Sequence, residues 1–202
     1  MTCIVGFESN GNVYIGGDSA ATDGNLGIRV RADGKVFSKD NMIFGIAGSV
    51  RLAQLLRYSF VPPNQSVGQD DFGYLCSSWI GGLLKCLQDN GCSKIVDNEA
   101  VMPGEFLLGF GGNLYHIYSD FQVADNSLPY DACGCASDYA LGVMAAVSED
   151  DKTPEEKITK ALEVAEEFSA GVMGPFVIKK LDSEQVDIVP ALVEILSKEN
   201  ND

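Results

Sequence analysis

A chain of 202 residues with 46% hydrophobic and 21% charged residues has the composition of a soluble globular protein, and it is long enough for one sizeable core. Its formal net charge of -15 argues against nucleic acid as a partner, because phosphates would be repelled. No window reaches the roughly 18 consecutive apolar residues of a membrane span, and no basic segment before an apolar run marks a secretory signal. We therefore expect one domain over residues 1–202, with no membrane partner, in the cytoplasm.

The chain begins with a predicted β-hairpin. Residues 3–8 and 13–17 are mostly apolar runs with β-branched members, and Asn10-Gly11 between them is a strong hairpin signal. Residues 19–34 are rich in Gly, Asp and Ala and form a long connection. Connections of this length in compact domains are often functional.

The remaining predicted elements alternate between helices and short strands. Apolar residues at three-to-four spacing indicate the helices, and Thr153-Pro154 followed by Glu156 is a complete helix start signal. In chain order the elements are a hairpin over 35–38 and 42–46, a helix beginning at Leu52, a helix from Phe72 to Gly91, strands over 105–110 and 114–118, helices over 137–147 and 153–171, strands near 176–180 and 186–188, and a terminal helix over 190–198. Hairpins separated by helix pairs predict an α+β fold, with two stacked antiparallel sheets between helix layers, an αββα sandwich.

The cysteines and the single histidine carry no recognisable metal or triad motif. The six cysteines have no C-x-x-C spacing, which favours free thiols over a zinc site or a disulfide framework. His116 lies on a predicted strand without a G-x-S-x-G motif, so we interpret it as structural. The glycines around Gly111 lack G-x-G-x-x-G spacing, which excludes a dinucleotide site there. The sequence therefore predicts no metal and no cofactor.

Thr2 carries chemistry of its own if Met1 is removed. A threonine at the first position has its α-amine within reach of its own hydroxyl, so the residue supplies both nucleophile and base. The reference pKa of an α-amine is about 7.7–8.0, and a useful fraction of it is therefore unprotonated near neutral pH. Cys3 becomes the alternative nucleophile only if both preceding residues are lost.

Several short blocks follow Thr2 in a fixed order. They are Thr2-Cys3-Ile4-Val5-Gly6, Gly17-Asp18-Ser19, Gly24-Asn25, Lys35-Val36, Ala47-Gly48-Ser49, Leu108-Gly109, Gly134-Cys135-Ala136-Ser137 and Ser169-Ala170-Gly171. In this order the chain resembles the proteasome β-subunits and the bacterial heat-shock-locus V peptidase, which are threonine-type N-terminal nucleophile hydrolases. The resemblance runs from Thr2 to about residue 188 and implies the same αββα fold.

The resemblance implies a catalytic role for four residues. Thr2 would be the nucleophile, and the positive charge of Lys35 would stabilise its alkoxide and hold down the pKa of its amine. Asp18 would pair with Lys35 and orient it. The backbone N–H of Gly48 would stabilise the tetrahedral oxyanion. The implied activity is that of a threonine endopeptidase.

The family's supporting groups fall on three further residues. Its usual serine falls on Cys135, with Ser137 two places later. Its usual later aspartate falls on Glu166, with Glu167 as the alternative, and Ser169 completes this set. The spacing from Asn25 to Lys35 is one residue longer than is usual in the family. A turn or bulge around 32–34 is needed to keep the lysine on the correct face.

The resemblance also implies partners. The segment Ala21-Thr22 would pair with an extended peptide by β-augmentation, and Ile46 and Val50 would border the pocket for the residue before the cut. The substrate would be a peptide or an unfolded protein, and the chain would assemble into a homo-oligomeric ring with an ATPase unfoldase as a further partner.

Two other functions stay open at the level of sequence. One is a catalytically silent structural subunit with the same fold. The other is an N-terminal nucleophile amidohydrolase that acts on small amides, which would keep Thr2 but needs a closed pocket instead of an open cleft.

Overall fold

The computed structural model describes residues 2–22 and 27–182, which form two antiparallel sheets flanked by helices. In spatial order the first sheet contains β12 (Tyr130–Cys133), β1 (Ile4–Ser9), β2 (Asn12–Gly17) and β13 (Val177–Leu181). The second sheet contains β11 (Val123–Asp125), β10 (Asn113–Ile117), β9 (Gly104–Phe110), β6 (Met42–Gly48) and β5 (Val36–Lys39). Two small hairpins pair β3 (Ala20–Thr22) with β4 (Ile28–Val30), and β7 (Lys94–Val96) with β8 (Glu99–Val101).

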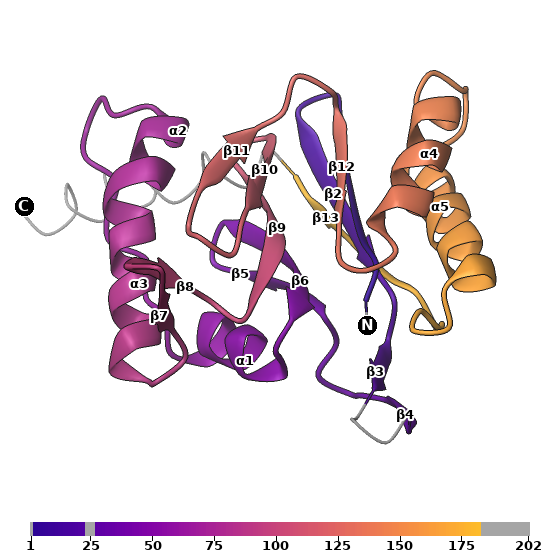
Figure 1. Ribbon diagram of the computed structural model, residues 1–202. Helices are drawn as coiled ribbons and strands as arrows, with labels where there is room; N and C mark the ends of the chain where they lie inside the picture. Colours follow the sequence, from indigo (N-terminus) through magenta and orange to yellow (C-terminus); the bar gives the residue numbers. More distant parts are fainter. Residues whose placement is uncertain (1, 23–26, 183–202) are drawn as a thin grey trace, which may run out of the picture.

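The helices cover the outer faces of the two sheets (Figure 1). The first sheet is covered by α4 (Ser137–Val147) and α5 (Pro154–Phe168), and the second sheet by α1 (Val50–Tyr58), α2 (Asp71–Tyr74), a π-helical turn η1 (Leu75–Trp79) and α3 (Ile80–Asp89). The layers therefore run helix, sheet, sheet, helix, which confirms the αββα sandwich. None of the described helices combines the length and apolar character that a membrane crossing requires.

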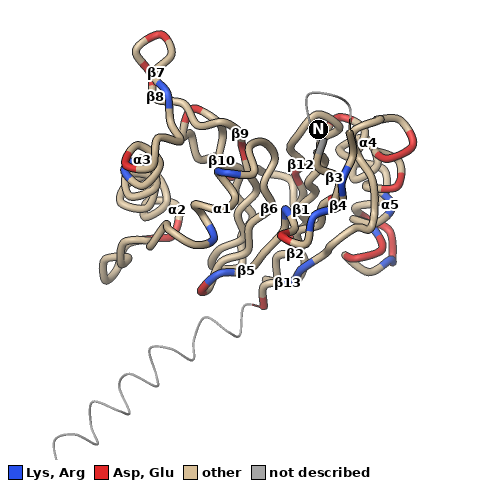
Figure 2. Tube along the Cα trace, turned by 90° about the horizontal axis from the view of Figure 1, so that it is seen from below, with Lys and Arg blue, Asp and Glu red and all other residues tan. Residues whose placement is uncertain are grey.

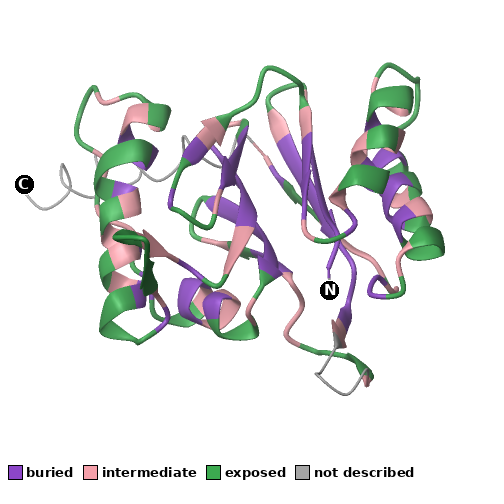
Figure 3. Ribbon diagram, viewed as in Figure 1, coloured by how far each residue is buried: buried purple, intermediate pink, exposed green. Residues whose placement is uncertain are grey.

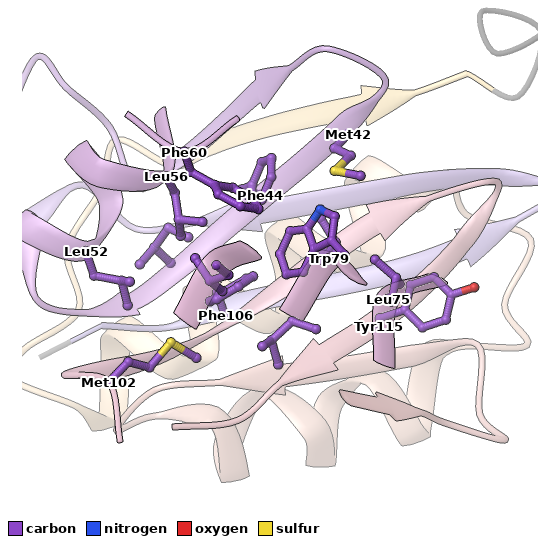
Figure 4. Packing of buried hydrophobic residues seen from close by; sticks show 14 of the residues in the cluster. Met42, Phe44, Leu52, Leu56, Phe60, Leu75, Trp79, Met102, Phe106 and Tyr115 are labelled. Carbon is purple, nitrogen blue, oxygen red and sulfur yellow. The ribbon is translucent and has the colours of Figure 1, made fainter. Parts of the chain in front are cut away.

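Alternating residues of each strand build separate apolar cores. On β6, Phe44 and Ile46 pack into the cluster under α1 and α3, whereas Ile43 and Ala47 pack into the cluster between the two sheets. The same two-residue period makes both sheets buried along their centres (Figure 3). The cluster under α1 and α3 contains most of the buried aromatic side chains of the described residues, among them Trp79, whose ring contacts those of Phe60 and Phe106 (Figure 4).

Glycine on β6 leaves room for side chains of the facing sheet. A Cβ atom on Gly45 would lie 2.5 Å from the Cγ2 atoms of both Ile4 and Ile15 on the facing sheet. Real Cβ contacts do not reach that distance, so a larger residue would push the sheets apart. Glycine on β6 therefore fixes the sheet spacing beside the start of β1.

The strong local signals of the sequence are confirmed. The Asn10-Gly11 turn has positive φ at both residues, 52° and 73°, as a two-residue hairpin requires. The Thr153 capping box forms in both directions with Glu156. The predicted helix from Phe72 to Gly91 forms as α2, η1 and α3, and the π-helical turn within it was not predicted.

Several short elements have no counterpart in the predictions. They are β3, β4, β7, β8, β11 and β12. The predicted strand near 186–188 and the predicted helix over 190–198 lie outside the described residues.

Candidate active site

Thr2 lies just before β1, where β1 meets the connection from β12 to α4. It is 6% exposed, and its backbone nitrogen donates a hydrogen bond to Cys135 Sγ at 3.3 Å. The Cys135 thiol lies 3.5 Å from the Thr2 carbonyl oxygen and donates to it. Gly134 has a φ of +97°, and a Cβ atom there would collide with the Thr2 carbonyl oxygen. The segment Gly134-Cys135 therefore wraps closely around the Thr2 backbone because it begins with glycine.

Asp18 and Lys35 form a largely buried ion pair in the same region. Lys35 Nζ lies 2.7 Å from Asp18 Oδ1, and the side chains are 18% and 0% exposed, respectively. Asp18 also accepts hydrogen bonds from the backbone N–H groups of Cys3, at 3.0 Å, and Ala20, at 3.1 Å. The position of Asp18 at the end of β2, antiparallel to β1, brings its carboxylate beside the first residues of the chain. The carboxylate is charge-stabilised by three donors, as a buried ionised group requires.

The surroundings shift the pKa values of two neighbouring groups in opposite senses. Burial lowers the pKa of Lys35, and the attraction of Asp18 partly offsets this effect. Burial and the repulsion of Asp18 raise the pKa of the Cys3 thiol to about 12. A thiol this weakly acidic is a poor nucleophile near neutral pH, which disfavours Cys3 as the attacking group.

Gly48 ends β6 directly before α1. Its φ is +134°, and a Cβ atom would lie 2.5 Å from the Cα of Gly104, so only glycine fits here. Ser49 then caps the helix by accepting from the Arg51 N–H at 3.1 Å. The backbone of Gly48 consequently faces the space around Thr2, and both residues line the same two pockets.

The first pocket extends from Thr2 along β3, β6 and α1. Its apolar wall includes Ala21, Ile46 and Val50. Its rim is charged, since Arg31 forms a two-pronged ion pair with Asp33 through bonds of 2.6 and 2.8 Å. The remaining lining residues are Ser19, Ala20, Gly34, Lys35, Ser49, Ala53, Gln54 and Arg57.

Charge is unevenly distributed around this pocket. Figure 2 shows acidic residues along α5 and in its connection to α4, whereas basic residues lie on β4, β5 and β13. Arg31, Lys35 and Arg57 all line the first pocket, and Arg57 is fixed there by a 2.6 Å hydrogen bond to the Gly34 carbonyl. The pocket is thus relatively basic in a chain whose net charge is -15.

A second pocket shares Thr2 and Gly48 with the first and is otherwise lined by different residues. Its lining residues are Thr2, Ala47, Gly48, Gly104, Glu105, Ser119, Gly134 and Cys135. Glu105 is anchored in it, because its Oε1 accepts the Gly134 N–H at 3.0 Å. Glu105 is also one of three neighbouring metal-ligating side chains, with His116 and Cys133.

Most of the residues predicted for the site lie together. The structure brings together Thr2, Asp18, Lys35, Gly48 and Cys135 as well as Ala21, Ile46 and Val50. Thr22 lies at the end of β3, where it pairs with Ile28 in the hairpin. The extra residue before Lys35 falls in a bend at residues 32–33, and Lys35 still faces Asp18.

Two of the predicted supporting residues have their described contacts elsewhere. Glu166 is exposed and accepts the Gly174 N–H at 2.9 Å. Ser169 caps the end of α5, and its carbonyl oxygen accepts from Val172. Glu166 is connected to the site indirectly. The segment next to Gly174 accepts two hydrogen bonds from Ser19, from its N–H to the Met173 carbonyl oxygen at 3.0 Å and from its hydroxyl to the Pro175 carbonyl oxygen at 2.6 Å.

Sequence reasoning missed Ser19, Arg57 and Glu105 as residues of the two pockets. Ser19 follows Asp18 directly, and this adjacency was an available signal. Arg57 lies in the last turn of α1, and Glu105 is the second residue of β9. Neither position has a local sequence pattern that points to a pocket.

Comparisons with known proteins support the architecture. No family model matches the chain, and no curated protein matches it. Among solved structures, it is similar to Thiobacillus denitrificans BPH, with a TM-score of 0.76 at 19% identity over 90% of this chain and 98% of that chain. The same BPH in complex with Epoxomicin gives a TM-score of 0.74 at 18% identity, again over 90% and 98%. Eukaryotic HslV from Trypanosoma brucei gives 0.64 at 16% identity, over 90% of this chain and 99% of that chain.

The sequence identities lie between 16% and 19%, so these similarities are evidence for the fold alone. The similarity covers nearly the whole of the neighbouring chains, so it includes both antiparallel sheets and the helix layers. The resemblance to proteasome-type and HslV-type proteins is therefore confirmed at the level of architecture. The chain has the αββα fold of the N-terminal nucleophile hydrolases, the fold that it shares with HslV.

Proposed function

We propose that this chain is a threonine endopeptidase that hydrolyses peptide bonds with Thr2 after removal of Met1. The observation that carries the proposal is the position of Thr2. It lines both pockets, and it shares the first pocket with Lys35, which forms a buried ion pair with Asp18. A nucleophile needs a base, a nearby positive charge and a donor for the oxyanion. The Thr2 amine, Lys35 and the Gly48 backbone would supply them.

The first half-reaction acylates Thr2. The unprotonated α-amine takes the proton of Oγ1 while Oγ1 attacks the carbonyl carbon of the substrate, and the carbonyl oxygen becomes an oxyanion. The ammonium then gives its proton to the leaving nitrogen, and the C–N bond breaks. The products are an ester on Thr2 Oγ1 and a free amine end of the peptide.

The second half-reaction releases the acyl group. The α-amine takes a proton from water, whose oxygen attacks the ester carbon, and the C–Oγ1 bond breaks with return of the proton to Oγ1. Cys135 contacts both the nitrogen and the carbonyl oxygen of Thr2, so we assign it a positioning role. In this scheme Lys35 acts as a cation, supported by its 2.7 Å ion pair with Asp18.

The presence of two pockets lined by Thr2 favours a peptide over a small amide. A peptide needs space both before and after the bond that is cut, whereas a small amide needs one closed cavity. The first pocket would accept the residue before the cut, with apolar contacts from Ile46 and Val50. The extended peptide would pair with the edge of β3 that β4 does not occupy.

We further propose that the chain assembles into a homo-oligomeric ring and receives unfolded substrate from an ATPase. Support comes from the fold and from exposed apolar side chains, including Tyr58, Val61 and Val67 in one stretch and Ile95 on the β7–β8 hairpin. Native mass spectrometry tests the ring directly. A monomer at working concentration would contradict it.

Hydrolysis of fluorogenic peptides by the full chain tests the proposed activity. We expect Thr2→Ala to remove it by a factor of about 10⁴ or more, and Thr2→Ser to retain a measurable part, because serine keeps the hydroxyl beside the amine. Thr159→Ala on α5, a matched threonine change away from the site, should leave the rate unchanged. If no peptide is hydrolysed by a chain shown by mass to begin at Thr2, the silent structural subunit is the better account.

A further inference from the structure

Three potential metal ligands converge beside the second pocket. Glu105 comes from β9, His116 from β10 and Cys133 from β12, and their ligand atoms all lie within 4.8 Å of one another. His116 and Cys133 are buried, at 5% and 1% exposure, whereas the Glu105 side chain is 34% exposed where it lines the pocket. Of the three side chains, only that of Glu105 is therefore accessible from the second pocket.

The histidine ring is held in one orientation. Its Nδ1 lies 2.8 Å from Asp131 Oδ2, and the ring stacks on Tyr118 with centroids 4.0 Å apart. Asp131 is itself fixed, since it accepts from Asn126 Nδ2 at 2.6 Å and from the Ala132 N–H at 2.7 Å. A carboxylate on Nδ1 selects the tautomer that carries its proton there, which leaves the lone pair on Nε2.

That second nitrogen has no hydrogen-bond partner among the described residues, although it is buried. It lies 3.6 Å from Glu105 Oε2, beyond hydrogen-bonding distance. A buried polar atom without a partner costs free energy, and such atoms are uncommon in folded proteins. The arrangement therefore points to a ligand between His116 Nε2, the Glu105 carboxylate and the Cys133 thiol.

We propose that Glu105 Oε2, His116 Nε2 and Cys133 Sγ bind a zinc ion. Nitrogen, thiolate and carboxylate are the ligands that zinc takes in tetrahedral sites, at about 2.0–2.3 Å from the metal. Two such ligands then lie roughly 3.3–3.8 Å apart, and the 3.6 Å between Glu105 and His116 falls in this range. Binding releases the Cys133 proton, and water from the second pocket completes the coordination.

The carboxylate–histidine pair strengthens the assignment. Zinc-bound histidines generally donate their other N–H to a carboxylate or carbonyl, and Asp131 occupies that position here. The proposal revises two expectations from the sequence, namely that His116 is structural and that the chain binds no metal. The sequence has no C-x-x-C or similar spacing, because the three ligands come from three separate strands.

The ion would join the two sheets next to Thr2. Cys133 belongs to the first sheet, and Glu105 and His116 belong to the second. Cys133 is followed directly by Gly134-Cys135, the segment that holds the Thr2 backbone. Zinc binding should therefore stabilise the fold and this segment together, independently of peptide hydrolysis.

Metal binding by the full chain tests the proposal after treatment with a chelator. We expect about one zinc ion per chain by elemental analysis, a rise in the midpoint of thermal unfolding on zinc addition, and a thiolate-to-metal absorption band when cobalt replaces zinc. Cys133→Ala should abolish the band, and Glu105→Gln should weaken zinc affinity at least tenfold. Asp131→Asn should weaken it about 10–100-fold while the stoichiometry is kept.

Matched controls separate this site from other thiols. Cys92→Ala, a buried cysteine in the core under α1 and α3, should leave binding and the cobalt band unchanged. Circular dichroism of each metal-free variant must match that of the parent, and Glu105→Gln changes only a partly exposed side chain. Absence of zinc binding would overturn the proposal. It would also be overturned if Cys133→Ala and Glu105→Gln bound zinc like the parent, or if Cys135→Ala alone abolished binding.

Discussion

Asp18 and Lys35 form one buried group of ionisable side chains, and His116, Asp131, Glu105 and Cys133 form another. In the first group the carboxylate receives an ammonium and two backbone N–H groups. In the second group Asp131 is well paired, but His116 Nε2 has no hydrogen bond among the described residues. Both groups adjoin pockets that Thr2 lines.

This difference in hydrogen bonding indicates that the two groups of buried ionisable side chains have different roles. A group with all its partners in place holds a charge at a fixed position, which suits a lysine that must stabilise a developing alkoxide. The proposed zinc ion would supply the partner that the second group lacks. The predictions below disrupt first the complete group, then an exposed hydrogen-bonded pair for comparison, and last the incomplete group.

Among changes to these two groups, the largest effect is expected from Lys35→Met, which keeps most of the length of the side chain and removes its charge. We expect peptide hydrolysis to fall by about 10²–10⁴, because the positive charge near Oγ1 is lost while Asp18 stays buried and unpaired. Steady-state kinetics on fluorogenic peptides measures it. Lys85→Met, which removes a charge from the exposed face of α3, is the control and should leave the rate unchanged. Retention of full activity by Lys35→Met would exclude the assigned role of the lysine.

Asp18→Asn should cost about 1–3 kcal/mol of stability, because an amide replaces only part of the acceptor capacity of the carboxylate. It should also shift the alkaline limb of kcat/KM to lower pH. Asp18 raises the pKa of Lys35 against the lowering effect of burial, so without this negative charge the ammonium loses its proton at lower pH.

The pH profile of kcat/KM for both forms checks the shift. Asp40→Asn is the matched control, since Asp40 lies in an exposed turn with a φ of 52°, a conformation that asparagine tolerates. An alkaline limb that stays in place in Asp18→Asn would mean that another group sets it.

Thr153→Ala calibrates the cost of breaking an exposed hydrogen-bonded pair. It removes half of the capping box with Glu156, and the expected loss is about 1 kcal/mol, or roughly 2–4 °C in the unfolding midpoint. Differential scanning calorimetry measures it, with hydrolysis unchanged. A loss as large as that of Asp18→Asn would show that burial adds little to the Asp18 contacts.

The smallest effect is expected from Glu105→Gln in metal-free protein. Glutamine keeps an oxygen for the Gly134 N–H, and the Glu105 carboxylate otherwise makes a 3.6 Å approach to His116 without a hydrogen bond. We therefore expect a stability change within about 0.5 kcal/mol. A loss of several kcal/mol would indicate that Glu105 and a protonated His116 form a strong ion pair, which would leave no need for zinc.

The parts of the fold with strong local signals could be predicted from the sequence. Asn10-Gly11 needs positive φ at both residues, and Thr153-Pro154 needs a helix after it, so each fixes an element without tertiary information. The short strands β3, β4, β7 and β8 have only three residues each, and tertiary contacts decide their structure. The π-helical turn over Leu75–Trp79 likewise has no sequence pattern.

The same distinction applies to the site. Thr2, Asp18, Lys35 and Gly48 could be proposed because the short blocks that contain them stand in the order of the family that the chain resembles. Glu105, His116 and Cys133 could not, since antiparallel pairing of β9 with β10 and packing of the two sheets bring them together. Glu166 shows that a role implied by resemblance does not always match the local contacts, because its described hydrogen bond is to the Gly174 backbone N–H and not to Thr2.

The central claim is that the α-amine of Thr2 is the catalytic base, and one comparison tests it most directly. Two preparations of the chain are made, one that begins at Thr2 and one that retains Met1, and intact mass is followed throughout the assay. The account predicts hydrolysis of fluorogenic peptides by the first preparation alone, because the amide of a Met1-bearing chain cannot accept the Oγ1 proton. Equal hydrolysis by the chain that still carries Met1 would contradict it.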